Sequence, residues 1–340
     1  MQSYSIVAAA LLGAAALSAA SAASAACQLK VTSELHLVME GNRPLVDGKV
    51  NGQPVRFLVD LGATSSSLSP AGAERLGIKA HKMNGVTYYG VGGGEVGGEA
   101  IVREVRFGNI VATNVDMLIV GRGMASSRYV GLMGQDLLTR GDIELDFANN
   151  VMRIITPAGC SGDDVVYWRK PYSLASLVPE GSNAVLVNVS INGQRATAQL
   201  DTGAPTSMVT TGMAERAGVK TASEGVHEDG KASGIAGRAI AQEIATFANV
   251  AVGDESISNA KLRMADMFGA DVEKQLGSLV ATRVVDGPDM LLGADFARAH
   301  HIYIARSQGK MYFSYNGGPI FQTVQPQGAA PAAPPAPPAP

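Results

Sequence analysis

Two short apolar runs, far apart in the chain, each end at an aspartate that small residues follow. Residues Val55–Val59 are rich in apolar and β-branched side chains and lead straight into Asp60. Residues Ala196–Leu200 form a weaker run that leads into Asp201. Runs this short, bounded by turn residues, predict strands rather than helices. Each aspartate is therefore expected on a tight turn at the end of a strand.

The same order of elements is predicted after both aspartates: a short strand, a helix of one or two turns ended by glycine, a glycine-rich hairpin, and an apolar run that meets a glycine. In the first copy these are Ser66–Ser69, Gly72–Leu76, Gly90–Gly98 and Leu132-Met133-Gly134. In the second copy they are Ser207–Thr210, Gly212–Ala217, Gly230–Gly237 and Leu291-Leu292-Gly293. Further strands are predicted at Ile143–Phe147, Val151–Ile155, Ile302–Ile304 and Met311–Tyr315.

A shift of 141 residues superimposes the two copies without a gap. Asp60 then falls on Asp201, and twelve of the twenty-nine positions from Asn51 to Lys79 are identical. A period this long indicates a duplicated domain rather than a solenoid repeat. We assign residues 27–158 to the first copy, 159–180 to a linker and 181–322 to the second copy. The second copy is longer, and the spacing of its extra apolar residues predicts an additional helix around Ala265–Val280.

Both ends of the chain are expected to lie outside the fold. The apolar, alanine-rich run Ile6–Ala26 ends in small residues and predicts that residues 1–26 are a signal peptide, with a retained membrane anchor as the alternative. The protein is therefore expected to be exported, to the periplasm or cell envelope. Residues 323–340 are rich in proline and alanine and predict a disordered tail.

The chain has two cysteines, Cys27 and Cys160. Cys27 directly follows the predicted cleavage site, a position that suits lipid attachment. A disulfide between the two cysteines is the second possibility, since an oxidising compartment permits it, and two free thiols are the third. The sequence leaves these alternatives open.

Composition and charge exclude several classes of function. The 340 residues include 46% hydrophobic and 17% charged residues, which is typical of a globular protein, and 40 glycines, which favour a turn-rich, mostly β architecture. The formal net charge of −3 argues against a nucleic-acid partner. No cysteine or histidine spacing predicts a metal site, and His300-His301 is interpreted as a surface pair. The glycines at 92, 94 and 97 match a dinucleotide-binding spacing, but no helix follows them, so no cofactor is expected.

The duplication predicts the chemistry. Two copies related by a pseudo-twofold axis bring Asp60 and Asp201 face to face. Two carboxylates at that distance share one proton and titrate as a pair. Such a pair can hold a water, deprotonate it for attack on a carbonyl carbon, and protonate the carbonyl oxygen. Asp136 and Asp295, which follow the glycines of the apolar runs, are interpreted as helix caps.

These residues resemble the pepsin/retropepsin-like aspartic proteases. Asp201-Thr202-Gly203-Ala204 is similar to the family's catalytic loop, the two apolar-apolar-glycine runs are similar to the strand that supports it, and Gly90–Gly98 is similar to the flap that covers bound peptide. The resemblance, over roughly residues 37–315, implies an all-β, bilobal acid protease fold with short helices and two duplicated lobes. It implies an aspartic endopeptidase that acts on polypeptides as a monomer, with both lobes in one chain.

Residue by residue, the resemblance implies that Asp60 and Asp201 are catalytic. Substrate binding and loop support are expected from Gly62, Ala63, Thr64, Gly92, Gly93, Gly94, Thr202, Gly203 and Ala204.

The first aspartate loop departs from the family pattern at Leu61, where the family has a threonine or serine whose hydroxyl bonds across the lobes. Thr202 can keep one crossing bond. Thr64 can support its aspartate, whereas Pro205 at the equivalent place cannot. A catalytically degenerate peptide-binding module of the same fold is therefore the alternative function, and a glycine-rich β-sandwich surface protein of the envelope is the third.

Overall fold

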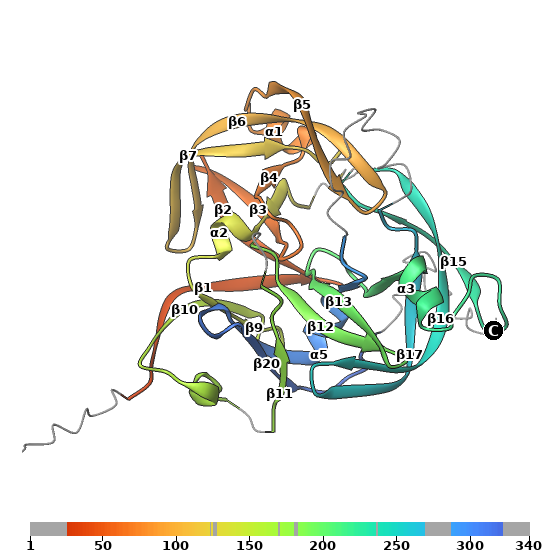
Figure 1. Ribbon diagram of the computed structural model, residues 1–340. Coiled ribbons are helices and arrows are strands. Elements are labelled where there is room, and N and C mark those ends of the chain that lie inside the picture. Colours follow the sequence, from red (N-terminus) through yellow and green to blue (C-terminus); the bar gives the residue numbers. More distant parts are fainter. Residues whose placement is uncertain are drawn as a thin grey trace, which may run out of the picture.

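The computed structural model describes residues 26–122, 124, 128–168, 171–179, 183–235, 237–268 and 287–321, with only the backbone for 82–86 (Figure 1). The predicted signal peptide, up to residue 25, and the proline-rich tail lie outside the described residues. So does most of the helix predicted at Ala265–Val280. Of its first four residues, Ala265 ends a strand and the next three are not helical.

The chain is built mainly from strands in two sheets, with short helices, as the sequence predicts. The first copy contributes β1 (Gln28–Glu40), β2 (Arg43–Val50), β3 (Gln53–Val59), β4 (Ser67–Leu68), α1 (Pro70–Arg75), β5 (His81–Gly90), β6 (Gly93–Phe107), β7 (Ile110–Ile119), β8 (Gly131–Met133), α2 (Gln135–Leu138), β9 (Asp142–Asp146) and β10 (Val151–Ala158). A 3-10 turn, η1 (Gly162–Val165), and β11 (Ser173–Ser176) lie within the predicted linker.

The second copy repeats this order. It contains β12 (Leu186–Ile191), β13 (Gln194–Leu200), β14 (Met208–Thr210), α3 (Thr211–Arg216), β15 (His227–Ser233), β16 (Ala239–Val252), β17 (Glu255–Ala265), β18 (Met290–Leu292), α5 (Ala294–Ala299), β19 (His300–Ala305), η2 (Arg306–Gln308) and β20 (Lys310–Tyr315). In Figure 1 the two copies lie side by side, red to yellow and green to blue. The predicted duplication is thus a duplication of structure.

Identical turns start the two copies of the motif. Asn51-Gly52 and Asn192-Gly193 have positive φ at both residues, near 50° for each asparagine and 80–84° for each glycine. Asparagine and glycine are the residues that tolerate this conformation, and it matches the twist of a two-residue hairpin. The turns set the register of β2 with β3 and of β12 with β13. That register places Asp60 and Asp201 at equivalent strand ends.

A run of six strands joins the two copies, in the order β11-β20-β19-β9-β10-β1. Strand β19 of the second copy pairs with β9 of the first, from His301↔Asp146 to Ile304↔Ile143. The ends of the chain therefore build one sheet from both copies, and a single hydrophobic core runs through the molecule.

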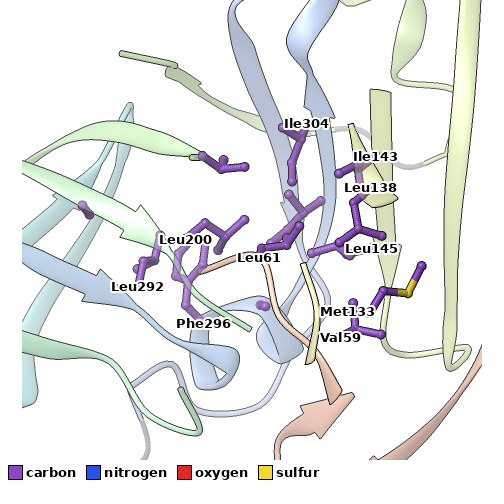
Figure 2. Close-up of a cluster of buried hydrophobic side chains, with 14 of the residues drawn as sticks. Val59, Leu61, Met133, Leu138, Ile143, Leu145, Leu200, Leu292, Phe296 and Ile304 are labelled. Atoms are coloured by element: carbon purple, nitrogen blue, oxygen red, sulfur yellow. The ribbon is translucent and has the colours of Figure 1, made fainter. Parts of the chain in front are cut away.

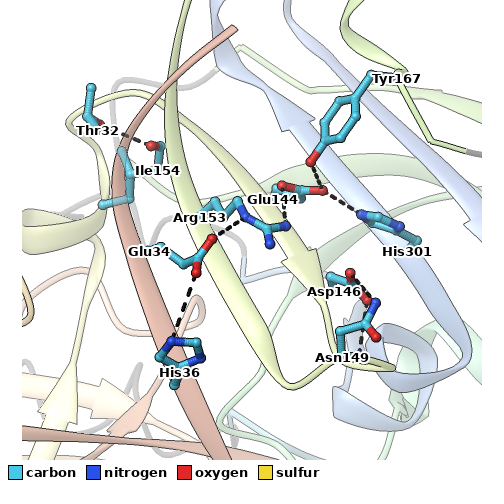
Figure 3. Close-up of polar contacts among 10 residues, drawn as sticks. All are labelled: Thr32, Glu34, His36, Glu144, Asp146, Asn149, Arg153, Ile154, Tyr167 and His301. Atoms are coloured by element: carbon cyan, nitrogen blue, oxygen red, sulfur yellow. Dashed lines mark hydrogen bonds and ion pairs between the residues drawn. The ribbon is translucent and has the colours of Figure 1, made fainter.

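A buried polar cluster lies on this shared sheet (Figure 3). Glu144 on β9 is fully buried and lies 2.6 Å from His301 Nε2 on β19. Tyr167 donates to Glu144 at 2.7 Å, and Arg153 donates to it at 3.1 Å. Burial alone would raise the pKa of Glu144, but these hydrogen bonds outweigh it and hold the pKa below its ordinary value. The cluster ties the first copy to the second.

The interpretation of His300-His301 as a surface pair is wrong. His300 is fully buried and His301 is 9% exposed, because β19 is an inner strand of the shared sheet. His301 stacks on Trp168, and His300 Nδ1 lies 2.7 Å from the Phe296 carbonyl oxygen. Both histidines have structural partners.

Cys27 and Cys160 form a disulfide, so the structure contains one of the three arrangements left open by the sequence. The bond joins the start of β1 to the residues after β10, beside the first pair of their ladder, Gln28↔Ala158. Within the described residues, no helix has the length and apolar character needed to cross a bilayer.

Candidate active site

Equivalent strand pairs hold the two aspartates. β3 runs parallel to β8, and β13 runs parallel to β18. Just beyond the ladders, the Asp60 N–H donates to the Met133 carbonyl at 3.0 Å, and the Asp201 N–H donates to the Leu292 carbonyl at 2.9 Å. The apolar-apolar-glycine runs are therefore the strands that support the aspartate turns, as predicted.

The two aspartate turns interlock through their glycines. A Cβ atom added to Gly62 would lie 2.5 Å from Asp201 Cγ, and one added to Gly203 would lie 2.5 Å from an Asp60 carboxyl oxygen. Only a residue without a side chain permits this approach. Each glycine thus contacts the carboxyl group of the opposite copy, and the pKa of each aspartate responds to the other carboxyl group.

Both carboxyl groups hold protons more tightly than an exposed aspartate. Burial is the main cause for each and raises both pKa values above the ordinary 3.8. For Asp60 the charge of Asp201 adds to burial, while the N–H groups of Gly62 and Ala63, at 2.8 and 3.0 Å, oppose it. Asp201 accepts the equivalent bonds from Gly203 and Ala204 and also lies near the positive charge of Arg43. The two carboxyl groups are therefore expected to share one proton and to titrate as a pair.

The crossing hydrogen bond expected of Thr202 is present. Thr202 Oγ1 donates to the Val59 carbonyl at 2.7 Å and accepts from the Leu61 N–H at 3.0 Å. Leu61, at the equivalent position, is fully buried and packs into the hydrophobic cluster of Figure 2, among Val59 and Leu200. The second copy therefore holds the first by the hydrogen bonds of Thr202, whereas the first copy contributes apolar packing at the equivalent position, Leu61.

A glutamine holds the backbone of the first turn. Gln135, at the start of α2, is fully buried and donates to the Leu61 carbonyl at 2.7 Å. Arg306 of the second copy donates to the Gln135 side-chain oxygen at 2.8 Å. Gln199 of the second copy donates to the Gly62 carbonyl at 2.9 Å. The Asp60 turn is thus fixed from the second copy despite the missing hydroxyl at Leu61.

Two sequence expectations differ from the structure. Thr64 is exposed on the cavity wall, and within the described chain Asp60 receives its hydrogen bonds from backbone N–H groups instead of the Thr64 hydroxyl. Asp136 and Asp295 do not cap helices, because Gly134 and Gly293 occupy the N-cap positions. They instead accept hydrogen bonds from serines, Ser66 and Ser207 respectively, at 2.6 Å. They brace the chain just after each aspartate turn.

A cavity of about 880 Å³ opens over the two aspartates, lined by both copies. Of the predicted site residues, Asp60, Gly62, Ala63, Thr64, Asp201, Gly203 and Ala204 line it. Thr202 lies beneath, fully buried.

The two glycine-rich hairpins, β5–β6 and β15–β16, meet at their tips over the cavity. Gly234 donates to the Val91 carbonyl at 3.1 Å, and Gly92 donates to the Met267 carbonyl at 2.9 Å. Thr87–Val91 of the first hairpin and Lys231–Ile235 of the second line the cavity, whereas Gly92, Gly93 and Gly94 do not line it. The chain turns over at the tip, where Gly92 and Gly93 have positive φ, so that Gly92 lies against Arg238 of the other hairpin. The three glycines therefore shape the hairpin instead of lining the cavity.

Sequence reasoning missed Arg43 and Tyr129, which line the cavity on the side of the first copy. Arg43 starts β2 and Tyr129 precedes β8. A signal for Arg43 exists in the register: Leu45 pairs with Leu58, and the same register continued by two residues beyond the ladder would place Arg43 opposite Asp60. Tyr129 carries no comparable signal, because it follows a loop.

Paired aspartates on interlocked turns, beneath two hairpins, define a site of the aspartic protease class. The sequence profile of the family described as "Aspartyl protease" matches residues 46–137 and 187–296, which is more than half of the chain and one segment in each copy. The chain belongs to the aspartyl protease family. The family implies a peptide substrate.

Individual relatives are more distant. The DNA damage-inducible protein 1 of Eremothecium gossypii is 29% identical over 152 residues, which cover 38% of this chain and 29% of that protein's length. A solved structure of a retropepsin-like aspartic protease from Rickettsia conorii matches 39% of this chain and 95% of its own, with 19% identity and a TM-score of 0.28.

Proposed function

We propose that this protein is an aspartic endopeptidase in which Asp60 and Asp201 activate a water molecule for hydrolysis of a peptide bond. The observation that carries the proposal is the reciprocal contact of Gly62 with the Asp201 carboxyl and of Gly203 with the Asp60 carboxyl. It joins the two acids into one centre at the floor of a cavity large enough for a peptide segment.

The two aspartates share one proton, and we propose that Asp60 holds it before the water attacks. Asp201 carries the negative charge and removes a proton from the water as its oxygen attacks the carbonyl carbon. Asp60 donates its proton to the carbonyl oxygen, which gives a neutral tetrahedral intermediate. When the C–N bond breaks, the leaving nitrogen takes the proton held by Asp201, and Asp60 regains a proton from the collapsing hydroxyl. The pair returns to its singly protonated state.

The alternative is a peptide-binding module that does not turn over, and Leu61 is the residue that motivates it. The contacts of Thr202, Gln135 and Gln199 favour the enzyme, because they hold both turns without a hydroxyl at position 61.

Incubation of the purified protein with an unfolded protein substrate at pH 4–7, with and without pepstatin, distinguishes the two. We expect cleavage that Asp60→Asn or Asp201→Asn abolishes and that Asp116→Asn leaves intact, since Asp116 is exposed on β7. Tight peptide binding by the wild type without any product would establish the module instead.

We further propose that the protein is exported to the periplasm or cell envelope and acts as a monomer. The disulfide between Cys27 and Cys160 supports an oxidising compartment, and the two aspartate turns supplied by one chain support a monomeric enzyme. Cell fractionation and the solution mass of the purified protein test the two statements.

A further inference from the structure

We propose that Arg43 binds a carboxylate of the peptide substrate, so that the enzyme selects peptides with an acidic group beside the cleaved bond. This inference rests on the proposed function and names a substrate class for the same cavity.

The position of Arg43 follows from the sheet. Continuing the β2–β3 register by two residues places Arg43 opposite Asp60, and cross-strand neighbours have side chains about 5 Å apart at Cβ. The same step along the β12–β13 register places Ala184 opposite Asp201. The duplication therefore puts a cation at one side of the aspartate pair, where its charge acts on Asp201, and a methyl group at the equivalent place in the second copy.

The Arg43 guanidinium has an N–H group that is available to hydrogen-bond a ligand. In the described part of the chain, no carboxylate lies within ion-pair distance of it, and its buried Nε has no hydrogen-bond partner. Glu40, its cross-strand neighbour on β1, binds Arg128 through Oε1 at 2.8 Å, and its buried Oε2 has no hydrogen-bond partner. A buried N–H without a partner costs free energy, which an arriving acceptor would recover.

The other charges of the cavity also favour a carboxylate. Among its described lining residues, the only acids are Asp60 and Asp201, whereas Arg43, Lys231 and Arg263 are cations. Arg263 is already paired with Asp229 and with Thr206, and Lys231 is exposed on β15. Arg43 is thus the cation placed inside the cavity with its donors uncommitted. A guanidinium binds a planar carboxylate by two parallel hydrogen bonds.

The subsite around Arg43 is otherwise apolar. Leu58, Leu132 and Tyr129 form a buried cluster there, with Ala63, Met124 and Ile235 packed against it. An acidic group with an aliphatic stem, such as a glutamate side chain, fits an apolar wall with one cation at its end. The free C-terminal carboxylate of a short peptide offers the same chemistry, so the test must separate these two sources.

The experiment uses a peptide that the wild-type protein cleaves, found by mass spectrometry of the digest of an unfolded protein. Glutamate or glutamine is placed in turn at each of three positions on either side of the cleaved bond, and each peptide is made with a free or an amidated C-terminus. We expect kcat/KM to be about 10- to 100-fold higher for glutamate than for glutamine at one position, the range for a hydrogen bond to a charged group. A preference for the free acid over the amide would identify the C-terminal carboxylate as the source.

The variants are Arg43→Met, Arg43→Lys and, as a matched control, Arg103→Met on the exposed face of β6. We expect Arg43→Met to abolish the preference, Arg43→Lys to keep part of it, and the control to keep it all. The proposal is overturned if Arg43→Met lowers kcat/KM equally for the acidic and neutral peptides, or merely moves the pH profile of both. It is also overturned if the wild type shows no preference.

Failure of the proposed hydrolysis can be told apart from failure of this proposal. If the wild type cleaves nothing, fluorescence anisotropy of the same labelled peptides measures binding directly. A preference for the acidic peptides that Arg43→Met removes would then support recognition without turnover. Equal binding of acidic and neutral peptides would reject the role of Arg43.

Discussion

Leu61 and Thr202 occupy equivalent positions in the two aspartate turns, and only Thr202 joins them by hydrogen bonds. Its hydroxyl spans 2.7 Å to the Val59 carbonyl and 3.0 Å to the Leu61 N–H. Val59, Leu61 and Thr202 are fully buried, so neither the Val59 carbonyl nor the Leu61 N–H can form a hydrogen bond with water instead. This hydroxyl therefore acts together with the packing around Leu61 and the hydrogen bonds of Gln135 and Gln199 to hold the two acids in place.

Thr202→Val is expected to lower the free energy of unfolding by about 2–4 kcal/mol, because it leaves a buried N–H and a buried carbonyl without their partner. Thr202→Ser keeps the hydroxyl and loses one methyl group, so about 1 kcal/mol is expected. Urea denaturation at neutral pH measures both. Equal losses for valine and serine would show that the methyl group, rather than the hydroxyl, holds the turns together.

Gly62→Ala and Gly203→Ala are expected to lower kcat/KM for peptide cleavage at least about 100-fold, since a displacement of about 1 Å at a reacting centre has that effect. Each added Cβ would lie 2.5 Å from the opposite carboxyl group and push the acids apart.

The control for these variants is Gly212→Ala in α3, where an added Cβ meets no atom within 4 Å. It should retain activity and gain slightly in stability, because alanine favours a helix over glycine. Full activity of Gly62→Ala would mean that catalysis does not need the close contact of Gly62 with the Asp201 carboxyl.

The duplication made the centre of this molecule predictable. Local patterns predict the aspartate turns, the supporting apolar runs and the short helices to within a few residues. The first helix begins at Pro70 instead of Gly72, because Ser69 caps it and proline suits the first turn.

The features that could not be predicted from the sequence depend on contacts between residues that are far apart in the chain. The burial of His301 requires β9, and the role of Asp136 requires Ser66, 70 residues away. Arg43 was missed because its relation to Asp60 exists only once β2 and β3 are paired.

Asp295 is expected to make stability fall as pH rises. Burial raises its pKa to about 6, against the ordinary 3.8, although hydrogen bonds from Ser207 oppose the shift. The folded state therefore binds the proton more tightly than the unfolded chain, so the stabilisation is complete below pH 3.8 and is lost as pH rises through about 6. The free energy of unfolding is expected to fall by about 3 kcal/mol through this titration.

Urea denaturation of the wild type and of Asp295→Asn, at steps from pH 3.5 to 7.5, measures this contribution. The difference in unfolding free energy between the two proteins should shift in favour of the variant by about 3 kcal/mol across that range. A constant difference would mean that Asp295 titrates as an ordinary aspartate.

The pH profile of kcat/KM should reach its maximum on the acid side of neutral. Burial raises the pKa values of both Asp60 and Asp201, so the pair holds a proton at higher pH than an exposed aspartate does, and it loses activity when it holds two protons or none. Rates with a neutral peptide from pH 3 to 9 test this. A rate that rises steadily to pH 9 would exclude a shared proton.

Loss of the disulfide should destabilise the protein without changing its fold. The bond closes a segment of 133 residues between Cys27 and Cys160, and removal of such a bond typically costs about 2–5 kcal/mol, largely through the unfolded chain. The ladder of β1 with β10 continues beside it from Gln28 to His36, so the native strands stay paired without the bond. The double variant Cys27→Ser/Cys160→Ser should therefore unfold at lower urea concentration and still cleave peptide.

Reduction supplies the control for this prediction. Wild-type protein in a reducing agent should match the double variant, and the double variant should not respond to the reducing agent at all. Intact mass before and after reduction and alkylation counts the thiols that the bond protects. If Cys27 instead carried a lipid, the mass would show the acyl chains, and reduction would leave the unfolding curve of the wild type unchanged.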